Sequence, residues 1–342
     1  MTSGSHNGES ASLYLHFPCF DGIVSGALAL LLLGKARGWR FDAIHGINYD
    51  LQPNWLNTHL PPHSCVVDFL YHPEAECWCD HHITTFLNSD LRAQFAARDK
   101  ALLMYDPESR SAARLLWNRG AEALGGSGRL DEMVQWADKI DAADYDGIDQ
   151  ALFGAEPALE ISRSLSVEAD TNYCDFLVRR LCDSTLRDLA AHAEVQRRLA
   201  QADELVREGL REVGEQIELQ GNVAVFDVVT EHASVNRYSA FYLYPDAQYS
   251  IGTIRSSDSV TVRINANPWL HFHSPNLGEL MRAAAQKAGL SSAGGGRERI
   301  GSLRLDNNSQ GVAREVVSYL VQKLHGDLKG KEGSQWQRAV RQ

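Results

Sequence analysis

Short apolar runs and longer runs with helical spacing alternate along the first half of the chain. A run that begins at Leu13 predicts a strand, which stops before a helix predicted over residues 23–35. Residues 39–47 and 64–68 predict two further strands, and the second is apolar almost throughout, as in a strand buried on both faces. Residues 77–79 predict a fourth strand. Strands that alternate with helices indicate an α/β domain with a parallel sheet.

The second half begins with a long polar helix and then returns to strand-like patterns. Between residues 186 and 217, apolar positions fall three or four apart, which predicts a helix. A polar helix of this length between two α/β patterns indicates a connector. Beyond it the pattern predicts a second sheet, with strands at residues 223–229, 247–254, 259–264 and 300–305 and helices at 277–288 and 311–324.

We therefore expect an α/β chain of two domains, which a length of 342 residues allows. An N-terminal parallel-sheet domain is joined by the long connector helix to a smaller C-terminal α/β domain. The expected boundaries are a disordered start at residues 1–10, the first domain at 11–184, the connector at 185–217, the second domain at 218–327 and a flexible tail at 328–342.

Polar side chains gather where the predicted strands of the first domain end. In an open α/β sheet, ligands bind at the carboxyl ends of the strands. A buried strand needs a reason to end in a carboxylate, and a metal ion is one. Hard divalent ions such as Mn²⁺ prefer carboxylate and imidazole ligands. The candidate residues at these strand ends are His16, Cys19, Asp21, Asp68, Asp80, His81 and His82.

The string Asp80-His81-His82 resembles the motif of the DHH phosphoesterase superfamily. Two other strand ends strengthen the resemblance. Residues 20–26 place an acid before the small residues of a helix start, and the lone Asp68 closes a later strand. When it stands in the same order along the chain as these two acids, the three-residue string is fairly specific for the family.

The resemblance runs from about residue 14 to residue 145 and resumes near the C-terminus. There, Gly295-Gly296-Arg297 resembles the Gly-Gly-His segment of the DHH-associated domain, with Arg in place of His. An arginine fork meets a phosphate better than an imidazole does. The resemblance therefore implies that the second domain closes over a substrate phosphate and that the active site lies in a cleft between the domains.

The resemblance also implies two Mn²⁺ ions, with Mg²⁺, Co²⁺ or Zn²⁺ as alternatives, and a role for each matching residue. For the metal ions, it implies that Asp68 bridges them, that His16 binds one, and that the other is bound by Asp21, His81 and Asp141. Asp80 would orient His81, and His82 would face the substrate phosphate. Arg297 and Arg237 would grip that phosphate beside Gly295 and Gly296.

Two positions leave alternatives open. The family's first motif usually carries two acids one residue apart, and here Cys19 takes the place of the first. A thiolate binds Mn²⁺ but favours softer ions such as Zn²⁺. Either Cys19 ligates a metal, or the first ion is weakly held, or the site uses one ion. Asp138 and Asp144 compete with Asp141, since each could instead cap or solvate a helix end.

Charge and composition narrow the substrate and the location. The net charge of −11 opposes tight binding of a long nucleic-acid duplex, which depends on basic contacts to phosphates. A small anionic substrate held by a few arginines and metal ions is compatible with this charge. No apolar run approaches the roughly 20 residues of a membrane span. Six cysteines without a secretion signal indicate reduced thiols in the cytoplasm.

These observations predict a cytoplasmic, divalent-metal-dependent phosphoesterase, a monomer or homodimer, that uses metal-activated water to hydrolyse short oligonucleotides or dinucleotides. The family also implies 3′-to-5′ exonuclease action as an option. Because of Cys19, the main alternative is a catalytically weak or inactive nucleotide-binding or regulatory protein of the same fold. A third hypothesis is a zinc-stabilised scaffold, whose Cys-x-Cys spacing lacks the usual two-residue gap; its ligands would be Cys65, Cys77, Cys79 and His63.

Overall fold

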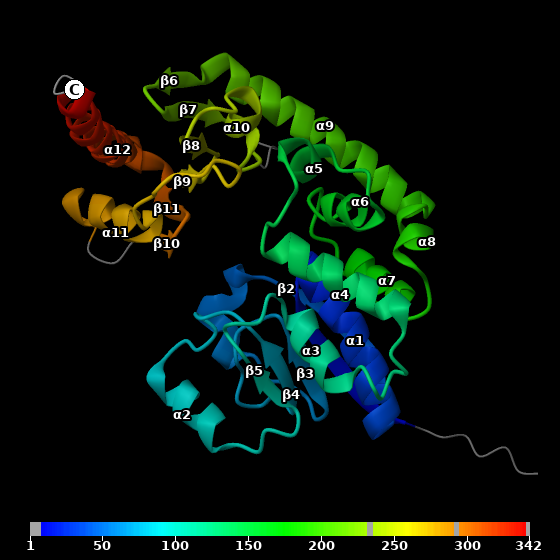
Figure 1. The fold of residues 1–342 in the computed structure, drawn as a ribbon. Coiled ribbons are helices and arrows are strands. Elements are labelled where there is room, and N and C mark those ends of the chain that lie inside the picture. The colour runs from blue at the N-terminus through cyan, green and yellow to red at the C-terminus, as the bar shows by residue number, and fades with distance from the viewer. Residues whose placement is uncertain (1–7, 231–234, 291–293, 340–342) are drawn as a thin grey trace, which may run out of the picture. The chain divides into compact units, whose positions relative to one another are not determined.

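The structure is a computed structural model of the chain. It describes residues 8–230, 235–290 and 294–339, and beyond residue 324 it describes the backbone alone. Two sheets are present, and helices lie against each of them (Figure 1). This arrangement confirms the predicted α/β class, with a parallel sheet in the N-terminal part and a second sheet in the C-terminal part.

The chain forms two compact units. The first unit contains residues 1–146 and 154–202, and the second contains residues 147–153 and 203–342. The short helix α5 (Ile148–Phe153) therefore belongs to the second unit, although the sequence pattern places it inside the first predicted domain.

A sheet of parallel strands forms the centre of the first unit. Its strands run in the order β2-β1-β3-β4-β5. The chain passes from β1 to β2 on one side and then returns to β3 on the other side of β1. The order therefore reverses between β1 and β3, which is where open α/β sheets bind ligands. The strands are β1 (Glu9–His16), β2 (Trp39–Ile47), β3 (Ser64–Val67), β4 (Cys77–Asp80) and β5 (Leu103–Tyr105).

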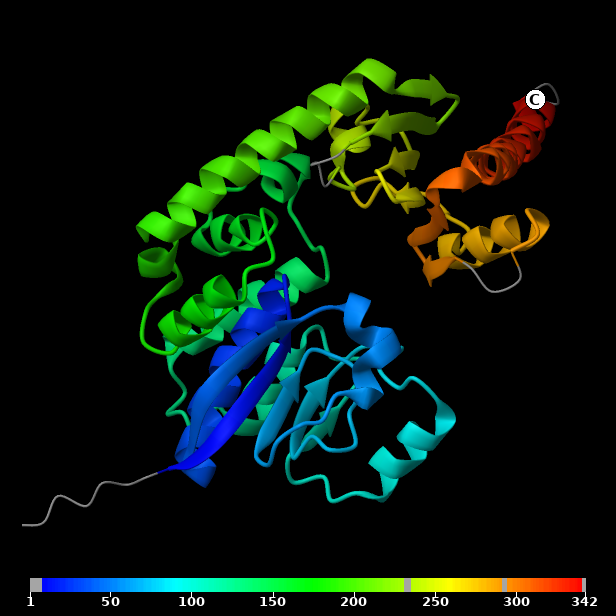
Figure 2. The ribbon, with the colours of Figure 1, turned by 180° about the vertical axis from the view of Figure 1, so that it is seen from behind.

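Helices cover both faces of this sheet. Alternate strand residues point to opposite faces, so Leu13 and Tyr14 lie in different layers. Leu13 joins the core formed with α1, α3, α4 and α7, whereas Tyr14 packs with Trp55 of η1 and Leu91 of α2. Figures 1 and 2 show α1 and α3 along the strands and α2 on the other side of the sheet. The helices are α1 (Phe20–Arg37), η1 (Tyr49–Asn57), α2 (Ser89–Ala97), α3 (Ala112–Gly120), α4 (Gly128–Asp141), α6 (Pro157–Ser164), α7 (Thr171–Leu181) and α8 (Leu186–Ala190).

The first strand and the first helix meet without room for a side chain. Gly22 lies in the first turn of α1, and a Cβ atom there would lie 2.0 Å from the carbonyl oxygen of His16. Glycine therefore lets the start of α1 approach the end of β1. This approach brings Asp21, the preceding residue, to the carboxyl edge of the sheet.

The predicted connector is divided into two helices. Helix α8 ends at Ala190, and α9 (Ala193–Gln216) follows after two residues. The division between the two units falls within α9, after Ala202. The long helix is thus present, but it is shorter than the predicted span of residues 186–217.

A mixed sheet forms the centre of the second unit, in the order β10-β11-β9-β8-β7-β6. Strands β7 and β8 are parallel and the other neighbours are antiparallel. Helices α11 and α12 share an apolar core with strands of this sheet. The elements are β6 (Glu218–Gln220), β7 (Val223–Val229), α10 (Ser239–Leu243), β8 (Tyr249–Arg255), β9 (Ser259–Ala266), α11 (Leu277–Lys287), β10 (Gly295–Arg297), β11 (Ile300–Asp306), η2 (Asn307–Ser309) and α12 (Gln310–Ala339).

Both ends of the described chain contain more regular structure than the sequence pattern predicts. Strand β1 begins at Glu9, so residues 9 and 10 do not belong to a disordered start, and residues 1–7 lie outside the described residues. Helix α12 continues to Ala339, past residue 324 and into the predicted tail. None of the described helices is both long and apolar enough to cross a membrane.

Candidate metal centre

Side chains from separate elements converge at the carboxyl edge of the parallel sheet. His16 ends β1, Asp68 directly follows β3, and Asp80 ends β4. Two helices add carboxylates: Asp21 lies in the first turn of α1, and Asp141 is the last residue of α4. The strand order brings these distant parts of the sequence together where the order reverses, between β1 and β3.

Among the described residues, three overlapping groups place metal-ligating atoms within 4.8 Å of one another. Asp68 belongs to two groups, and so does His81. A pair of neighbouring ions that share a ligand needs groups with a residue in common, as these groups have. The groups are His16, Cys19 and Asp68; Asp21, His81 and Asp141; and Asp68, Asp80, His81 and His82. The structure thus brings together all the side chains of the first unit that the resemblance implies as ligands.

Asp68 is the most unusual member of the cluster. Its side chain is fully buried, and no nitrogen or oxygen donor of a described residue bonds to either carboxylate oxygen, while the thiol of Cys19 lies within hydrogen-bonding reach. Its neighbours are imidazole nitrogens at 3.5 Å (His16 Nδ1), 3.7 Å (His82 Nδ1) and 3.9 Å (His81 Nε2). Its backbone φ is 56°, a left-handed conformation that Asp and Asn adopt more readily than most residues.

Asp21 is held rigidly by the start of a neighbouring helix. Its two carboxylate oxygens accept hydrogen bonds from the backbone N–H groups of Ala112 and Ala113, at 2.7 and 2.9 Å. The Ser25 hydroxyl donates a third bond at 3.1 Å. The two backbone donors, Ala112 and Ala113, lie in the first turn of α3, where the helix favours negative charge. Asp21 Oδ2 lies 3.8 Å from Nε2 of His81, so the carboxylate is positioned to share a ligand with that imidazole.

The two histidines of the motif are oriented by different partners. His81 Nδ1 lies 3.0 Å from the carbonyl oxygen of Ser109, which leaves Nε2 facing the acids. Asp80 Oδ1 accepts a hydrogen bond from the His81 backbone N–H at 2.8 Å, rather than from the His81 ring as the resemblance implies. The same oxygen lies 2.8 Å from His82 Nδ1 and so orients that ring. A partner on the second nitrogen fixes the tautomer of a ligating histidine.

The contacts of the three candidate acids in and after α4 distinguish them. Asp138 accepts hydrogen bonds from the Ser111 hydroxyl at 2.6 Å and from the Arg114 guanidinium at 2.6 and 2.9 Å. Asp144 accepts a bond from an arginine at 2.6 Å. Asp141 Oδ2 instead lies 3.4 Å from Nε2 of His81. The geometry favours Asp141 as the acid nearest a metal.

The electrostatics of the cluster disfavour its charged forms. Burial raises the pKa of the Asp68 carboxyl well above its usual range, and nearby carboxylates raise it further. Burial, followed by the charge of Asp141, raises the pKa of Asp21 to about 6. Burial also lowers the pKa of His16 to about 4 and raises the pKa of the Cys19 thiol. A bound divalent cation reverses such shifts because it supplies the missing opposite charge.

These residues fit a divalent cation. Buried polar atoms are nearly always hydrogen-bonded, yet several atoms that face the centre have no nitrogen or oxygen partner among the described residues: His16 Nδ1, His81 Nε2 and both carboxylate oxygens of Asp68. Each of these atoms has a lone pair in its ligating form. Divalent cations would accept these lone pairs together, whereas a single hydrogen-bond donor would satisfy one of them.

The zinc-scaffold hypothesis does not fit the structure. Cys65 of β3 lies opposite Cys77 of β4, and both join Cys79 in the apolar core. His63 Nδ1 lies 2.9 Å from a carboxylate oxygen of Glu76. Within the described part of the chain, none of these four candidate ligands belongs to a group that could hold a metal. The three thiols fill the core beneath the sheet.

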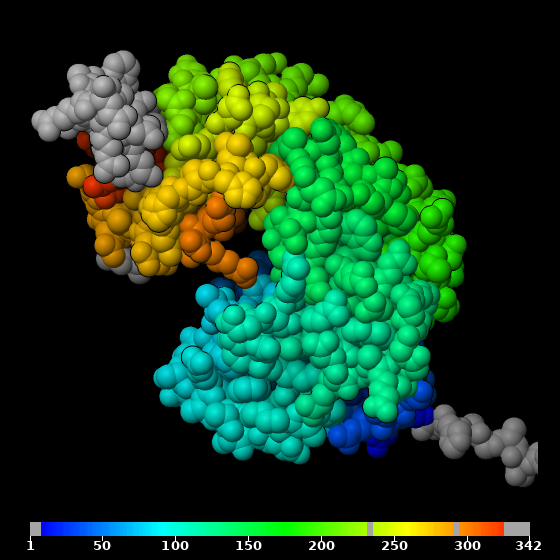
Figure 3. All heavy atoms as spheres, in the orientation of Figure 1, coloured from blue at the N-terminus to red at the C-terminus, as the bar shows by residue number. Residues whose placement is uncertain are grey.

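The implied phosphate-gripping residues lie in the second unit. Gly295, Gly296 and Arg297 form β10, which pairs with β11 in an exposed hairpin that projects from the surface of this unit (orange in Figure 3). A Cβ atom at Gly296 would lie 2.0 Å from a carbonyl oxygen at the start of β11, so the hairpin requires glycine there. Arg297 and Arg237 are both exposed, and the Arg237 guanidinium lies 4.7 Å from the centre of the next residue's tyrosine ring.

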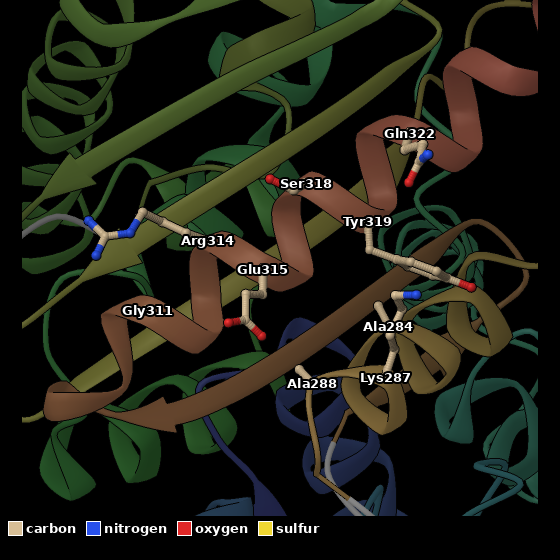
Figure 4. A pocket seen from close by; sticks show the side chains of 9 residues that line it. All are labelled: Ala284, Lys287, Ala288, Gly311, Arg314, Glu315, Ser318, Tyr319 and Gln322. Atoms are coloured by element: carbon tan, nitrogen blue, oxygen red, sulfur yellow. The ribbon is translucent and has the colours of Figure 1, made fainter.

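A groove of about 650 Å³ lies between α11 and α12 of the second unit. Figure 4 shows Lys287 and Tyr319 approaching each other across it, and the ammonium lies 5.6 Å from the ring centre. Its lining contains one carboxylate, that of Glu315. A single carboxylate is too few ligands for a metal centre. We therefore do not include this groove in the candidate site, which lies in the first unit.

Two groups that support the centre were not found from the sequence. One is the backbone carbonyl of Ser109, which holds the His81 ring. The other is Asn48, whose side chain lies within hydrogen-bonding reach of the His16 ring. Asn48 directly follows β2 and so lies at the same edge of the sheet. That position, one residue past a predicted strand, was the signal available in the sequence.

The fold is similar to that of several solved structures. The pGpG-specific phosphodiesterase PggH from Vibrio cholerae has a TM-score of 0.68 and 18% sequence identity, over 92% of this chain and 99% of that chain. The DHH domain of a member of a ribosomal-protein family has a TM-score of 0.54 and 12% identity, over 93% and 87% of the two chains. The likeness to these proteins extends over nearly the whole of this chain.

RecJ from Thermus thermophilus, solved in complex with Mn²⁺, has a TM-score of 0.55 and 14% identity over 92% of this chain. The matched part is 52% of the RecJ chain, so this chain spans about half of RecJ. No protein-family model and no curated protein sequence matches the chain. At these identities, the similarities establish a shared fold.

Proposed function

We propose that this chain, which has the fold of the DHH superfamily, is a divalent-metal-dependent phosphoesterase that hydrolyses phosphodiester bonds in dinucleotides or short oligonucleotides. One observation carries the proposal: buried ring nitrogens of His16 and His81, which have no hydrogen-bond partner among the described residues, lie 3.5 and 3.9 Å from the buried carboxylate of Asp68 at the ligand-binding edge of the sheet. The PggH and RecJ likenesses support this reaction class, since a phosphodiesterase and a Mn²⁺-binding protein share the fold.

Two ions would be held by the overlapping groups. His16, Cys19 and Asp68 would hold one ion, Asp21, His81 and Asp141 would hold the other, and Asp68 would contact both. When bound, the ions supply an activated water at neutral pH and neutralise phosphate charge. Mn²⁺ is the ion we propose, because carboxylate and imidazole ligands suit it and the Mn²⁺ complex of RecJ has the same fold.

The protein groups around the ions would position the phosphate. Nδ1 of His82 is held by Asp80, which orients the ring, and the other ring nitrogen would donate to a phosphate oxygen when the ring carries both protons. Such a donor stabilises the negative charge that develops as the phosphorus is attacked. Arg297, with Arg237, would grip the substrate phosphate from the second unit, and Gly295 and Gly296 would let the backbone come close to it.

We propose a short substrate because the net charge of −11 disfavours a long duplex and because PggH, similar over its whole length, is specific for the dinucleotide pGpG. The six free thiols are consistent with action in the cytoplasm. The test is release of mononucleotide from pGpG, from other dinucleotides and from single strands labelled at either end, with Mn²⁺ present or chelated. End labels distinguish 3′-to-5′ digestion from the opposite direction.

Asp68→Asn and His81→Ala should each lower turnover by at least about 10³-fold, since charge stabilisation by the ions contributes several kcal/mol. Arg314→Ala, on an exposed turn of α12, is the matched surface control and should retain activity. Turnover that persists unchanged in both site variants would refute the proposal.

The second candidate is a nucleotide-binding or regulatory protein without catalysis, favoured by the thiol at Cys19. It predicts nucleotide binding with no turnover in Mn²⁺, Co²⁺, Mg²⁺ or Zn²⁺. Calorimetry with pGpG, run beside the turnover assay, separates the two functions.

A further inference from the structure

We infer that the two metal positions of the proposed phosphoesterase differ in chemistry: the position formed by His16, Cys19 and Asp68 takes a thiophilic ion of the zinc class, and the position formed by Asp21, His81 and Asp141 takes a hard ion such as Mn²⁺. This inference rests on the proposed function, since it assigns the ions that the same centre would use.

The two positions present different donor atoms. The first offers one imidazole nitrogen, one thiol sulfur and one carboxylate oxygen, all within 4.8 Å of one another. The second offers one imidazole nitrogen and two carboxylate oxygens. Thiolates select zinc-like ions, whereas carboxylates suit Mg²⁺ and Mn²⁺. The single sulfur atom therefore separates the preferences of two positions that are otherwise alike.

The first position also has the ligand count of a catalytic zinc site. Such sites have three protein ligands and an open fourth place for water or substrate. Tetrahedral donors around zinc lie about 3.5 Å apart. His16 Nδ1 and Asp68 Oδ2 are already 3.5 Å apart. Both atoms are buried and lack a nitrogen or oxygen partner among the described residues, so they are ready to bind an ion.

The thiol of Cys19 faces the carboxylate that would share the ion, since it lies within hydrogen-bonding reach of Asp68. Cys19 is the N-cap residue of α1, but its side chain makes no capping hydrogen bond. It is a free thiol, without a disulfide partner. Burial, followed by the charges of three nearby carboxylates, raises the pKa of this thiol. Binding of a divalent ion would displace the thiol proton to solvent and form the sulfur–metal bond.

This difference has a consequence for activity. An ion held by sulfur, nitrogen and oxygen would stay bound through purification, while the ion on the harder position exchanges. Activation by added Mn²⁺ would then follow single-site saturation. Without the thiol, both positions would depend on added Mn²⁺.

Cobalt substitution tests the sulfur ligand directly. Co²⁺ replaces zinc and gives a near-ultraviolet thiolate-to-cobalt charge-transfer band only when a thiolate binds it. The metal-free wild-type chain should develop this band with one equivalent of Co²⁺. Cys19→Asp and Cys19→Ser should lose the band. Cys182→Ser, which removes another partly buried thiol in the first unit, should keep it.

Zinc affinity provides the second measurement. In competition with a chromogenic chelator, Cys19→Asp should bind zinc at least about 100-fold more weakly, since loss of an outer-shell partner alone costs 10–100-fold. The same variant should bind a second Mn²⁺ more tightly than wild type. Near-ultraviolet circular dichroism of each variant confirms that it is folded, and Cys19→Ser replaces Cys19→Asp if the added charge prevents folding.

The outcomes separate this inference from the proposed function. A cobalt band that persists without Cys19, or is absent from wild type, overturns the inference, as does unchanged zinc affinity in the folded variants. Hydrolysis of dinucleotides with no cobalt band leaves the proposed function standing and refutes the assignment of the ion. A Cys19-dependent band in a chain that hydrolyses no phosphodiester supports the zinc-class position and refutes the proposed function.

Discussion

Replacing Asp68 with asparagine should make the metal-free protein more stable and should remove its stabilisation by metal. The Asp68 carboxylate is fully buried, no nitrogen or oxygen donor of a described residue bonds to it, and the donor within reach is the weakly donating thiol of Cys19. Without a cation, this group destabilises the fold. Asparagine keeps the shape and cannot ionise. It also tolerates the φ of 56° at this position, whereas alanine would add backbone strain.

The expected magnitude follows from the burial of this group. A buried polar group without a partner costs about 1–3 kcal/mol, and a charged one costs more. For a domain of this size, 1 kcal/mol shifts the melting temperature by about 2–4 °C. Asp68→Asn should therefore raise the melting temperature of the metal-free first unit by roughly 2–12 °C. Metal at 100 times its Kd should stabilise wild type by about 2.7 kcal/mol, and should leave the variant almost unchanged.

Thermal unfolding, followed by circular dichroism in chelator and in Mn²⁺, measures both effects in one pair of proteins. The order of stability should invert: the variant should unfold at the higher temperature in chelator and wild type at the higher temperature in Mn²⁺. A wild-type melting temperature that is unaffected by Mn²⁺, Co²⁺ and Zn²⁺ would refute the reasoning. So would a variant that is destabilised in chelator, because Asp68 would then have a stabilising partner.

Three other predictions concern the surroundings of the site. Gly22→Ala should lower the free energy of urea unfolding by about 3 kcal/mol or more, because its Cβ would lie 2.0 Å from a carbonyl oxygen. Gly34→Ala on the same helix, where a Cβ would lie 3.5 Å from its nearest neighbour, should stabilise the fold by about 0.5–1 kcal/mol, and equal effects of the two changes would contradict the close approach. Asp138→Ala should lose about 1–3 kcal/mol of stability yet keep its Mn²⁺ affinity in calorimetry, whereas Asp141→Asn should keep its stability and lose Mn²⁺ affinity. A loss of Mn²⁺ binding in Asp138→Ala alone would reassign the metal ligand to Asp138. Arg297→Ala should raise the KM for a dinucleotide at least about tenfold, with unchanged Mn²⁺ binding, since it removes a charge-assisted phosphate contact; an unchanged KM would exclude this contact.

Elements with a strong apolar signature were predictable from the sequence. The strand over residues 39–47 agrees with β2, and the strand over residues 77–79 agrees with β4, which continues by one residue to Asp80. Strand β4 is buried at every position, whereas β2 alternates at its start between buried aromatic residues and the exposed Arg40 and Asp42, and both patterns are typical of strands. The helices α6 and α7 and the short strands β6 and β10 were not predicted. They are brief, and brief elements depend on packing more than on local periodicity.

The ends of elements depended on contacts that a pattern does not contain. The predicted first helix began at residue 23, whereas α1 begins at Phe20, because Gly22 lets the helix start directly against the end of β1. The predicted connector appeared continuous, since its apolar spacing continues across residues 191–192, where the chain leaves the helical conformation. Hydrogen bonding and packing at such positions override propensity.

The types of ligand were readable in the sequence, but their partners were not. Strand ends indicated His16, Asp68 and the histidines of the motif, because carboxylate and imidazole at the edge of an α/β sheet suit divalent ions. The sequence left Asp141 undecided among three acids. Only the tertiary structure separates them, since Asp138 is occupied by Arg114 from another helix.

By itself, the order of apolar and polar residues determined the class of fold, the parallel strands of the first sheet and the chemical character of its carboxyl edge. Those features are local, and each depends on a few neighbouring positions in the chain. Only the tertiary structure decided which lone pairs remain without a partner, because hydrogen-bond partners come from elements that are distant in sequence. The metal proposal rests on that second kind of information.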